Sequence, residues 1–168
     1  SGKTIAIIGY GNTGSAFKKI LEGFNINILI YDKYLEKYPY KSSMKYIYEK
    51  ADIISLHVPL TRETEYFIQE KTINKFKKSF YLVNTSRGKC VKTKDLIAGL
   101  KNKKILGACL DVIEEESSSF EKINQKSIKE LTNMSNVILT PHIAGWTIES
   151  NIKIAETLLK KINSDFPL

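Results

Sequence analysis

Short apolar runs alternate with stretches of helical periodicity along this chain, and this alternation constrains the fold more than any other feature. Six runs have the length and composition of buried strands: 4–8, 26–31, 52–57, 80–84, 105–110 and 137–140. Strands that alternate with helices are typical of βαβ units, in which neighbouring strands run parallel. The sequence therefore predicts an α/β fold with a doubly wound parallel sheet in a single domain.

The segments between these runs contain the expected helices and turns. Apolar residues recur at helical spacing from about residue 15 to 24, and further helices are expected at 43–50, 72–76, 93–103 and 148–162. Ser43 and Thr93 are the expected N-caps of two of these helices. Residues 40–41 are expected to add a short extra strand, and 114–133 to form a long polar loop.

Size, charge and cysteine usage exclude several classes of protein. A chain of 168 residues with 42% apolar residues can bury the core of one domain, and it has no apolar stretch near the ~20 residues of a membrane span. Cys90 and Cys109 lack the spacing of a metal site and are expected to be reduced thiols in a cytoplasmic protein. The net charge of +8 comes from scattered lysines, which favours a solvated surface over binding of nucleic acid.

The first functional motif lies between the first strand and the first helix. Residues 9–14 read GYGNTG, with glycines at Gly9, Gly11 and Gly14. In this context the glycines permit a tight turn and let the backbone approach a pyrophosphate, which the helix N-terminus stabilises. The motif predicts a dinucleotide site on a Rossmann fold.

A carboxylate in the expected place supports this site. Asp32 ends the second strand, eighteen residues beyond Gly14, close to the spacing of an acid that binds a ribose diol. Its charge would repel a 2′-phosphate, so NAD is favoured over NADP, although the neighbouring Lys33 weakens this preference.

Further chemical groups follow the later strands. Arg87 is one of only two arginines in the chain and follows the fourth run, where its planar fork could grip a carboxylate. Asp111 and the acidic residues 114–116 follow the fifth run, and His142 follows the sixth. Histidine is the usual proton donor near neutral pH, whereas the other histidine, His57, is more simply a hydrogen-bonded structural residue. Ligands of open parallel sheets gather at these strand ends.

Six features in order along the chain resemble one family: GYGNTG at 9–14, Asp32, HVPLTRET at 57–64, NTSRG at 84–88, GACLDVIEEE at 107–116 and TPHIAG at 140–145. They are similar to the nucleotide-binding domain of the NAD-dependent D-2-hydroxyacid dehydrogenases, the group that includes D-3-phosphoglycerate dehydrogenase. The resemblance covers essentially the whole chain. It departs at Ser117, where the family commonly has proline.

The resemblance implies a role for each matching residue. Arg87 would bind the substrate carboxylate and carbonyl oxygen, His142 would be the acid/base, and Glu116, five residues beyond Asp111, would be its acidic partner. Glu114 and Glu115 remain alternatives to Glu116. The family's NAD contacts fall on Gly9, Gly11, Asn12, Thr13, Gly14, Asp32, His57, Val58, Pro59, Thr64, Asn84, Thr85, Ser86, Arg87, Asp111, His142, Ala144 and Gly145.

Family members also carry a second, substrate-binding domain. The resemblance therefore implies that residues 1–168 are an NAD-binding domain without its substrate domain, which would bind NAD but turn over little substrate. The expected substrate is a small 2-hydroxy or 2-oxo acid, with D-3-phosphoglycerate favoured, and a homodimer is expected. The alternative is a non-catalytic dinucleotide-binding regulatory module, because a fold does not determine a function.

Overall fold

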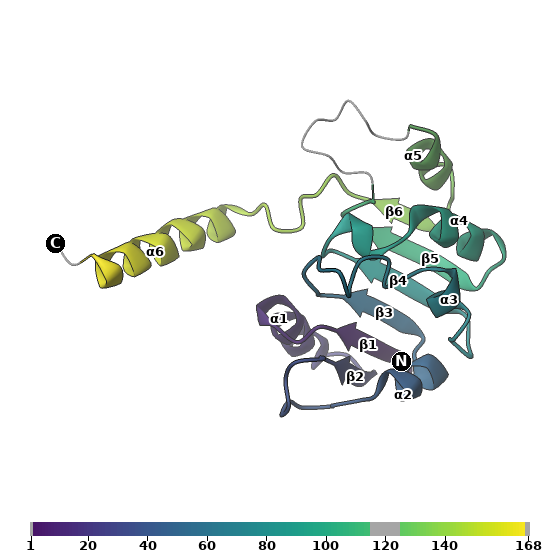
Figure 1. Cartoon of the computed structure of the whole chain (residues 1–168), viewed down its shortest axis with the longest axis horizontal. Helices are drawn as coiled ribbons and strands as arrows, with labels where there is room; N and C mark the ends of the chain where they lie inside the picture. The colour runs from purple at the N-terminus through teal and green to yellow at the C-terminus, as the bar shows by residue number, and fades with distance from the viewer. Residues whose placement is uncertain (1, 115–124, 167–168) are drawn as a thin grey trace.

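The computed structural model describes residues 2–114 and 125–166, and a parallel sheet forms its centre (Figure 1). Its six strands are β1 Thr4–Ile8, β2 Asn27–Tyr31, β3 Ile53–Leu56, β4 Phe80–Asn84, β5 Ile105–Leu110 and β6 Val137–Leu139. They lie in the order β2-β1-β3-β4-β5-β6, and every neighbouring pair is parallel. The six predicted strands and the parallel α/β fold are confirmed.

Helices connect the strands. They are α1 Asn12–Leu21, α2 Met44–Lys50, α3 Glu70–Ile73, α4 Thr93–Lys101, α5 Gln125–Thr132 and α6 Ile148–Asp165, with the 3₁₀ turn η1 Gly88–Cys90. The chain moves from β1 to β2 in one direction across the sheet, and from β2 to β3 and onward in the other. Because crossovers between parallel strands are right-handed, α1 lies on one face and α2 to α5 on the other, as expected of a doubly wound sheet.

Most of the core lies between the sheet and the α2–α5 layer. Phe80, Leu82 and Ile105 are fully buried on the strands, and Ile47 of α2 and Leu96 of α4 pack against the same cluster. Strands β1 and β3 to β5 are mostly buried because they carry nearly continuous apolar residues. This rigid layer fixes the positions at which the strands end.

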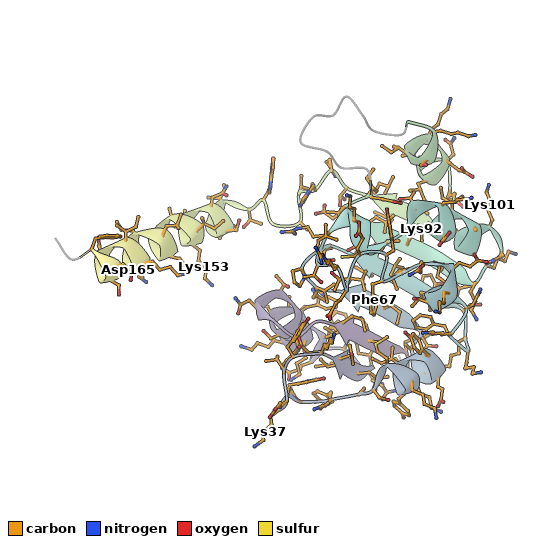
Figure 2. All side chains as sticks on the ribbon, in the orientation of Figure 1. Lys37, Phe67, Lys92, Lys101, Lys153 and Asp165 are labelled. Carbon is orange, nitrogen blue, oxygen red and sulfur yellow. The ribbon has the colours of Figure 1, made fainter. Side chains whose placement is uncertain are left out.

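The opposite face is less covered. Tyr81, Leu106 and Ile138 are 39–62% exposed there, and Ile20 and Phe24, predicted to lie on the apolar face of the first helix, are 67% and 62% exposed. Helix α6 extends away from the sheet (Figures 1 and 2), and none of its residues is buried. No helix within the described residues is long and apolar enough to cross a membrane.

Local predictions had mixed outcomes. Ser43 caps α2 as predicted, because its hydroxyl accepts a hydrogen bond from the Tyr46 N–H at 3.2 Å. Residue Lys41 forms the predicted stub of a strand through an isolated bridge to Ile30. The predicted cap Thr93 is wrong, since it is the first residue of α4 itself.

Two corrections concern the segment after β5. The Glu114 carboxylate accepts a hydrogen bond from the Thr93 N–H at 2.7 Å, so a side chain from a distant segment caps α4. The expected loop at 114–133 contains helix α5, and in its polar sequence QKSIKELT the buried side chain is Leu131. One buried residue gave too weak a periodic signal to predict this helix.

Candidate functional site

A pocket of about 430 Å³ lies at the carboxyl ends of β1, β2 and β3. At this point the connection from β1 leads to β2 on one side, and the connection from the neighbouring β3 leads to β4 on the other, which is where open α/β sheets bind ligands. A larger hollow of about 630 Å³ lies at the other end, near the starts of β1 and β2. The smaller pocket is the candidate site, because it contains the predicted residues Gly9, Gly11, Asp32, His57, Val58, Pro59 and Thr64.

The glycine turn is shaped by close backbone contacts. Gly9 has a φ of +94°, and a Cβ there would lie 2.4 Å from the carbonyl oxygen of His57. A Cβ on Gly14 would lie 2.1 Å from the Gly9 oxygen, whereas one on Gly11 would meet nothing within 4 Å. Only glycine fits at Gly9 and Gly14, whereas the space around Gly11 leaves the backbone open to a ligand.

The N-terminus of α1 is suited to an anion. Its N-cap residue is Gly11, so no side chain caps the first turn, and that turn carries no acidic residue. The predicted residues Asn12 and Thr13 form this turn and are exposed. Unpaired N–H groups and the positive end of the helix dipole stabilise phosphate groups. The turn therefore fits the pyrophosphate of a dinucleotide.

Asp32 joins the glycine turn to the end of β2. Its Oδ2 accepts a hydrogen bond from the Tyr10 N–H at 2.8 Å, and its Oδ1 accepts from the N–H groups of Tyr34 and Leu35 at 2.9 and 3.0 Å. Burial by itself raises the pKa of this carboxyl, but the three N–H donors lower it below its ordinary value. An ionised carboxylate therefore lies where the predicted ribose contact would be.

The loop after β3 forms the other wall of the pocket. The His57 ring contacts Phe17, with ring centres 5.1 Å apart, and its Nε2 lies 2.9 Å from the Ser55 hydroxyl oxygen. Burial lowers the pKa of His57 to about 4, so the ring is neutral at pH 7. Thr64 donates its hydroxyl to the Pro59 carbonyl at 2.6 Å. His57 thus has the structural role expected of it, and it also lines the pocket.

Buried polar contacts hold the NTSRG turn after β4. The Asn84 side chain donates to the Arg87 carbonyl at 3.0 Å and accepts from the N–H and hydroxyl of Ser86 at 3.1 and 2.8 Å. A Cβ on Gly88 would lie 1.7 Å from the Ile113 oxygen, so the turn packs directly on the segment after β5. Asn84 and Ser86 shape the turn, while Thr85 and Arg87 are exposed.

Asp111 organises the loop that carries His142. Its carboxylate, 3% exposed, accepts hydrogen bonds from the Thr140 hydroxyl at 2.5 Å and from the N–H groups of Ile143 and Ala144 at 2.9 Å. Burial raises the pKa of Asp111, and these donors lower it below its ordinary value. Between the donors Thr140 and Ile143, the backbone of His142 has a φ of 56°. Such a conformation costs energy and is common at functional sites.

The structure brings two of the three predicted catalytic residues, Arg87 and His142, to one edge of the sheet together with the predicted cofactor contact Asp111. Arg87, Asp111 and His142 follow β4, β5 and β6, which are neighbours in the sheet. Ala144 and Gly145 continue the His142 loop and are exposed. Glu116 lies outside the described residues, as does Glu115. Glu114 is occupied as the cap of α4, which favours Glu116 over Glu114 as the partner of His142.

Sequence reasoning missed part of the pocket wall. Lys33, Tyr34, Thr61, Glu63 and Phe67 also line it. Lys33 adjoins Asp32, and Thr61 and Glu63 belong to the segment HVPLTRET at 57–64. Their positions beside predicted contacts could have identified them as pocket residues. The described residues include no group of three or more His, Cys, Asp or Glu side chains that could hold a metal ion.

Comparison with known proteins supports a dinucleotide site. Residues 1–144 match the family model of the NAD-binding domain of D-isomer specific 2-hydroxyacid dehydrogenases. The chain is 39% identical over 168 residues to a glyoxylate reductase of Thermofilum pendens, covering 96% of this chain and 48% of that protein. It is 37% identical over 163 residues to a D-lactate dehydrogenase of Staphylococcus aureus, covering 91% and 49%.

Solved structures agree. The NAD-complexed D-isomer specific 2-hydroxyacid dehydrogenase of Lactobacillus delbrueckii ssp. bulgaricus superimposes with a TM-score of 0.85 at 30% identity, covering 98% of this chain and 54% of that one. D-lactate dehydrogenase of Lactobacillus jensenii with NAD⁺ gives 0.83 at 36% identity, covering 94% and 51%. The chain spans about half the length of the relatives it matches. It belongs to the D-isomer specific 2-hydroxyacid dehydrogenases, of which it contains the NAD-binding domain.

Proposed function

We propose that this chain is the cofactor-binding half of an enzyme that interconverts a D-2-hydroxy acid and a 2-oxo acid. The observation that carries the proposal is that Arg87, Asp111 and His142 follow three adjacent strands of the sheet. They lie on the same edge as a pocket that fits a dinucleotide. The glycine turn and the uncapped start of α1 would hold the pyrophosphate, and Asp32 would hold the adenosine ribose. NAD, when bound, supplies or accepts the hydride.

Each catalytic group has a distinct task in the proposed reaction. The exposed Arg87 would bind the substrate carboxylate through its planar fork and stabilise the charge that develops on the carbonyl oxygen. His142 would donate a proton to that oxygen in reduction and remove it in oxidation, an effect typically worth about 10²–10⁴-fold in rate. Glu116 would orient the His142 ring.

The names of the relatives favour one class of substrate. The relatives named above are a glyoxylate reductase and a D-lactate dehydrogenase, which favours a small 2-oxo acid such as glyoxylate or pyruvate over the expected phosphoglycerate. We further propose that a substrate domain outside this sequence closes over the strand ends. Exclusion of water from the reacting centre requires such a cover.

The test compares this chain with a longer protein in which a relative's substrate domain is joined to it. NADH oxidation is followed with glyoxylate, pyruvate and 3-phosphohydroxypyruvate. We expect the chain alone to bind NADH with little turnover, and the two-domain protein to reduce a small 2-oxo acid. Arg87→Lys in that protein should lower kcat/KM by about 10²-fold or more, because lysine cannot form the bidentate contact.

The matched control is Arg62→Lys, which changes the only other arginine and should leave kcat/KM nearly unchanged. Ordinary turnover by the chain alone would contradict the two-domain proposal. NADH binding without reduction of any 2-oxo acid by the two-domain protein would instead favour the regulatory module. Preferential reduction of 3-phosphohydroxypyruvate would restore the phosphoglycerate expectation.

A further inference from the structure

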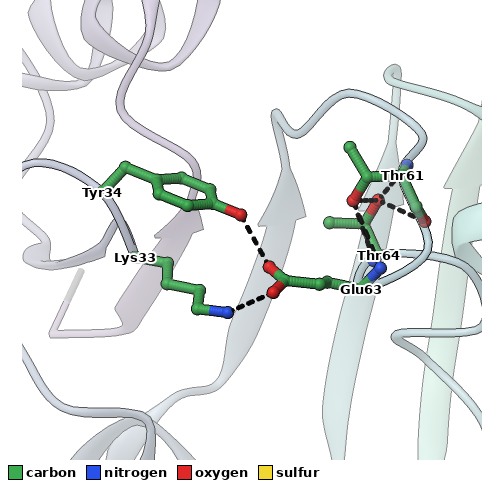
Figure 3. A network of polar contacts seen from close by, with 5 residues as sticks. All are labelled: Lys33, Tyr34, Thr61, Glu63 and Thr64. Carbon is green, nitrogen blue, oxygen red and sulfur yellow. Dashed lines mark hydrogen bonds and ion pairs between the residues drawn. The ribbon is translucent and has the colours of Figure 1, made fainter.

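A bridge of side chains joins the two loops on either side of the glycine turn (Figure 3). The Lys33 ammonium lies 2.5 Å from Oε1 of Glu63, and the Tyr34 hydroxyl donates to Oε2 of Glu63 at 2.7 Å. Lys33 and Tyr34 follow β2, whereas Glu63 lies beyond β3, and β1 separates these strands. All three residues line the candidate dinucleotide pocket, so the bridge spans it.

The backbone on both sides of the bridge is held in place. Asp32 accepts hydrogen bonds from the Tyr34 and Leu35 N–H groups, which fixes the first loop. In the second loop, the Thr61 N–H donates to the Thr64 hydroxyl oxygen at 2.8 Å, and that hydroxyl donates to the Pro59 carbonyl. Thr61 and Thr64 lie near Glu63 in Figure 3. The bridge therefore connects two loops whose backbone is already fixed by other hydrogen bonds.

The charges of the bridge bear on which cofactor can enter. Lys33 adjoins Asp32, the expected ribose contact, and an available ammonium there would attract the 2′-phosphate of NADP. Both partners remain accessible, with the Lys33 and Glu63 side chains 54% and 50% exposed. Such an exposed pair contributes little to the stability of the fold. The hydrogen bond to Glu63 raises the pKa of Lys33, and the same bond lowers the pKa of Glu63, so both are charged at neutral pH.

We propose that Glu63 is a specificity-determining residue that disfavours NADP by occupying Lys33 and Tyr34. With Glu63 present, the carboxylates of Asp32 and Glu63 outnumber the single ammonium of Lys33 on this wall, and a 2′-phosphate meets net negative charge. Without it, Lys33 can turn to the phosphate. This inference rests on the assignment of the pocket as the adenosine site of NAD.

The experiment is a calorimetric titration of the chain with NADH and with NADPH. Wild type should bind NADH more tightly than NADPH. Glu63→Gln should lower the Kd for NADPH about tenfold, the size of one hydrogen bond to a charged group, while the Kd for NADH changes less than about threefold. In the double variant Lys33→Gln/Glu63→Gln, the Kd for NADPH should return to about the wild-type value, because the ammonium that would bind the phosphate is gone.

Glu65→Gln is the matched control. It removes the same charge from an exposed position on the same loop, and Glu65 forms none of the ion pairs recorded among the described residues. It should leave both Kd values near those of wild type. An unchanged NADPH Kd in Glu63→Gln, or an equal gain in Glu65→Gln, would overturn the proposal while the NADH site stands. Absence of NADH binding to wild type would overturn the site assignment itself, and this inference with it.

Discussion

At the scale of single residues, the site depends on buried and partly buried polar groups that are held by specific contacts. Asp32 and Asp111 each accept hydrogen bonds from two or three backbone N–H groups, and each thereby fixes a loop at a strand end. The neutral His57 ring instead contacts the side chains of Phe17 and Ser55. Because burial is tolerable for these groups only in one ionisation state, the pH dependence of stability reports on them.

His57 gives a prediction with a definite sign. Its pKa is about 4 in the folded protein and about 6.5 when exposed, so the unfolded chain takes up the proton first as the pH falls. Stability from this group is present at pH 7 and is lost between about pH 6.5 and pH 4. We expect the free energy of unfolding to fall by about 1–2 kcal/mol less between pH 7 and pH 5 in His57→Gln than in wild type.

Urea denaturation of both proteins at the two pH values measures this difference. Glutamine keeps a partner for the Ser55 hydroxyl but does not titrate, which makes it the suitable replacement. Equal losses in the two proteins would show that His57 is not buried in its neutral form.

At the scale of elements, the turn between β1 and α1 contains glycines with two different roles, one in packing and one in the predicted binding of the cofactor. Gly14 is required by packing, since a side chain there would collide with the carbonyl oxygen of Gly9. Gly11 has free space around it and an ordinary φ of −72°, so the fold does not require glycine there. We predict that glycine is needed there for the approach of the cofactor to the backbone.

This distinction predicts opposite outcomes for two alanine substitutions. Gly11→Ala should change the free energy of unfolding by less than about 1 kcal/mol, yet weaken NADH binding about tenfold or more, because its methyl group stands where the backbone meets the pyrophosphate. Gly14→Ala should destabilise the protein by about 1–3 kcal/mol through overpacking. Thermal unfolding and NADH titration of both variants measure the two effects. Unchanged NADH binding in Gly11→Ala would remove the pyrophosphate from this turn.

The strands and the glycine turn could be predicted because their signals are local. An apolar run such as 105–110 indicates a strand by its own composition, and the turn at 9–14 depends on its own glycines. The cap of α4 could not be predicted, because Glu114 reaches Thr93 from 21 residues away in sequence. The contact of Lys33 with Glu63 is of the same kind, 30 residues apart.

At the scale of the whole molecule, one face of the chain is left open. The exposed apolar residues of β4 to β6 and the unburied α6 lie on a chain that spans about half the length of its relatives. The lysines labelled in Figure 2 lie after β2, at the two ends of α4 and on α6, which fits a dispersed charge. The expected homodimer and cytoplasmic location, and the expected lack of nucleic-acid binding, remain predictions.

The most direct test of the central claim is an NMR titration of the amide resonances with NAD. The claim is that NAD binds at the carboxyl ends of the strands, between the glycine turn and the loops after β2 and β3. We predict saturable shifts at 9–14, 32–35 and 58–64. Shifts confined to the larger hollow around Thr4, Phe24 and Lys50, or no saturable shift at all, would contradict the account.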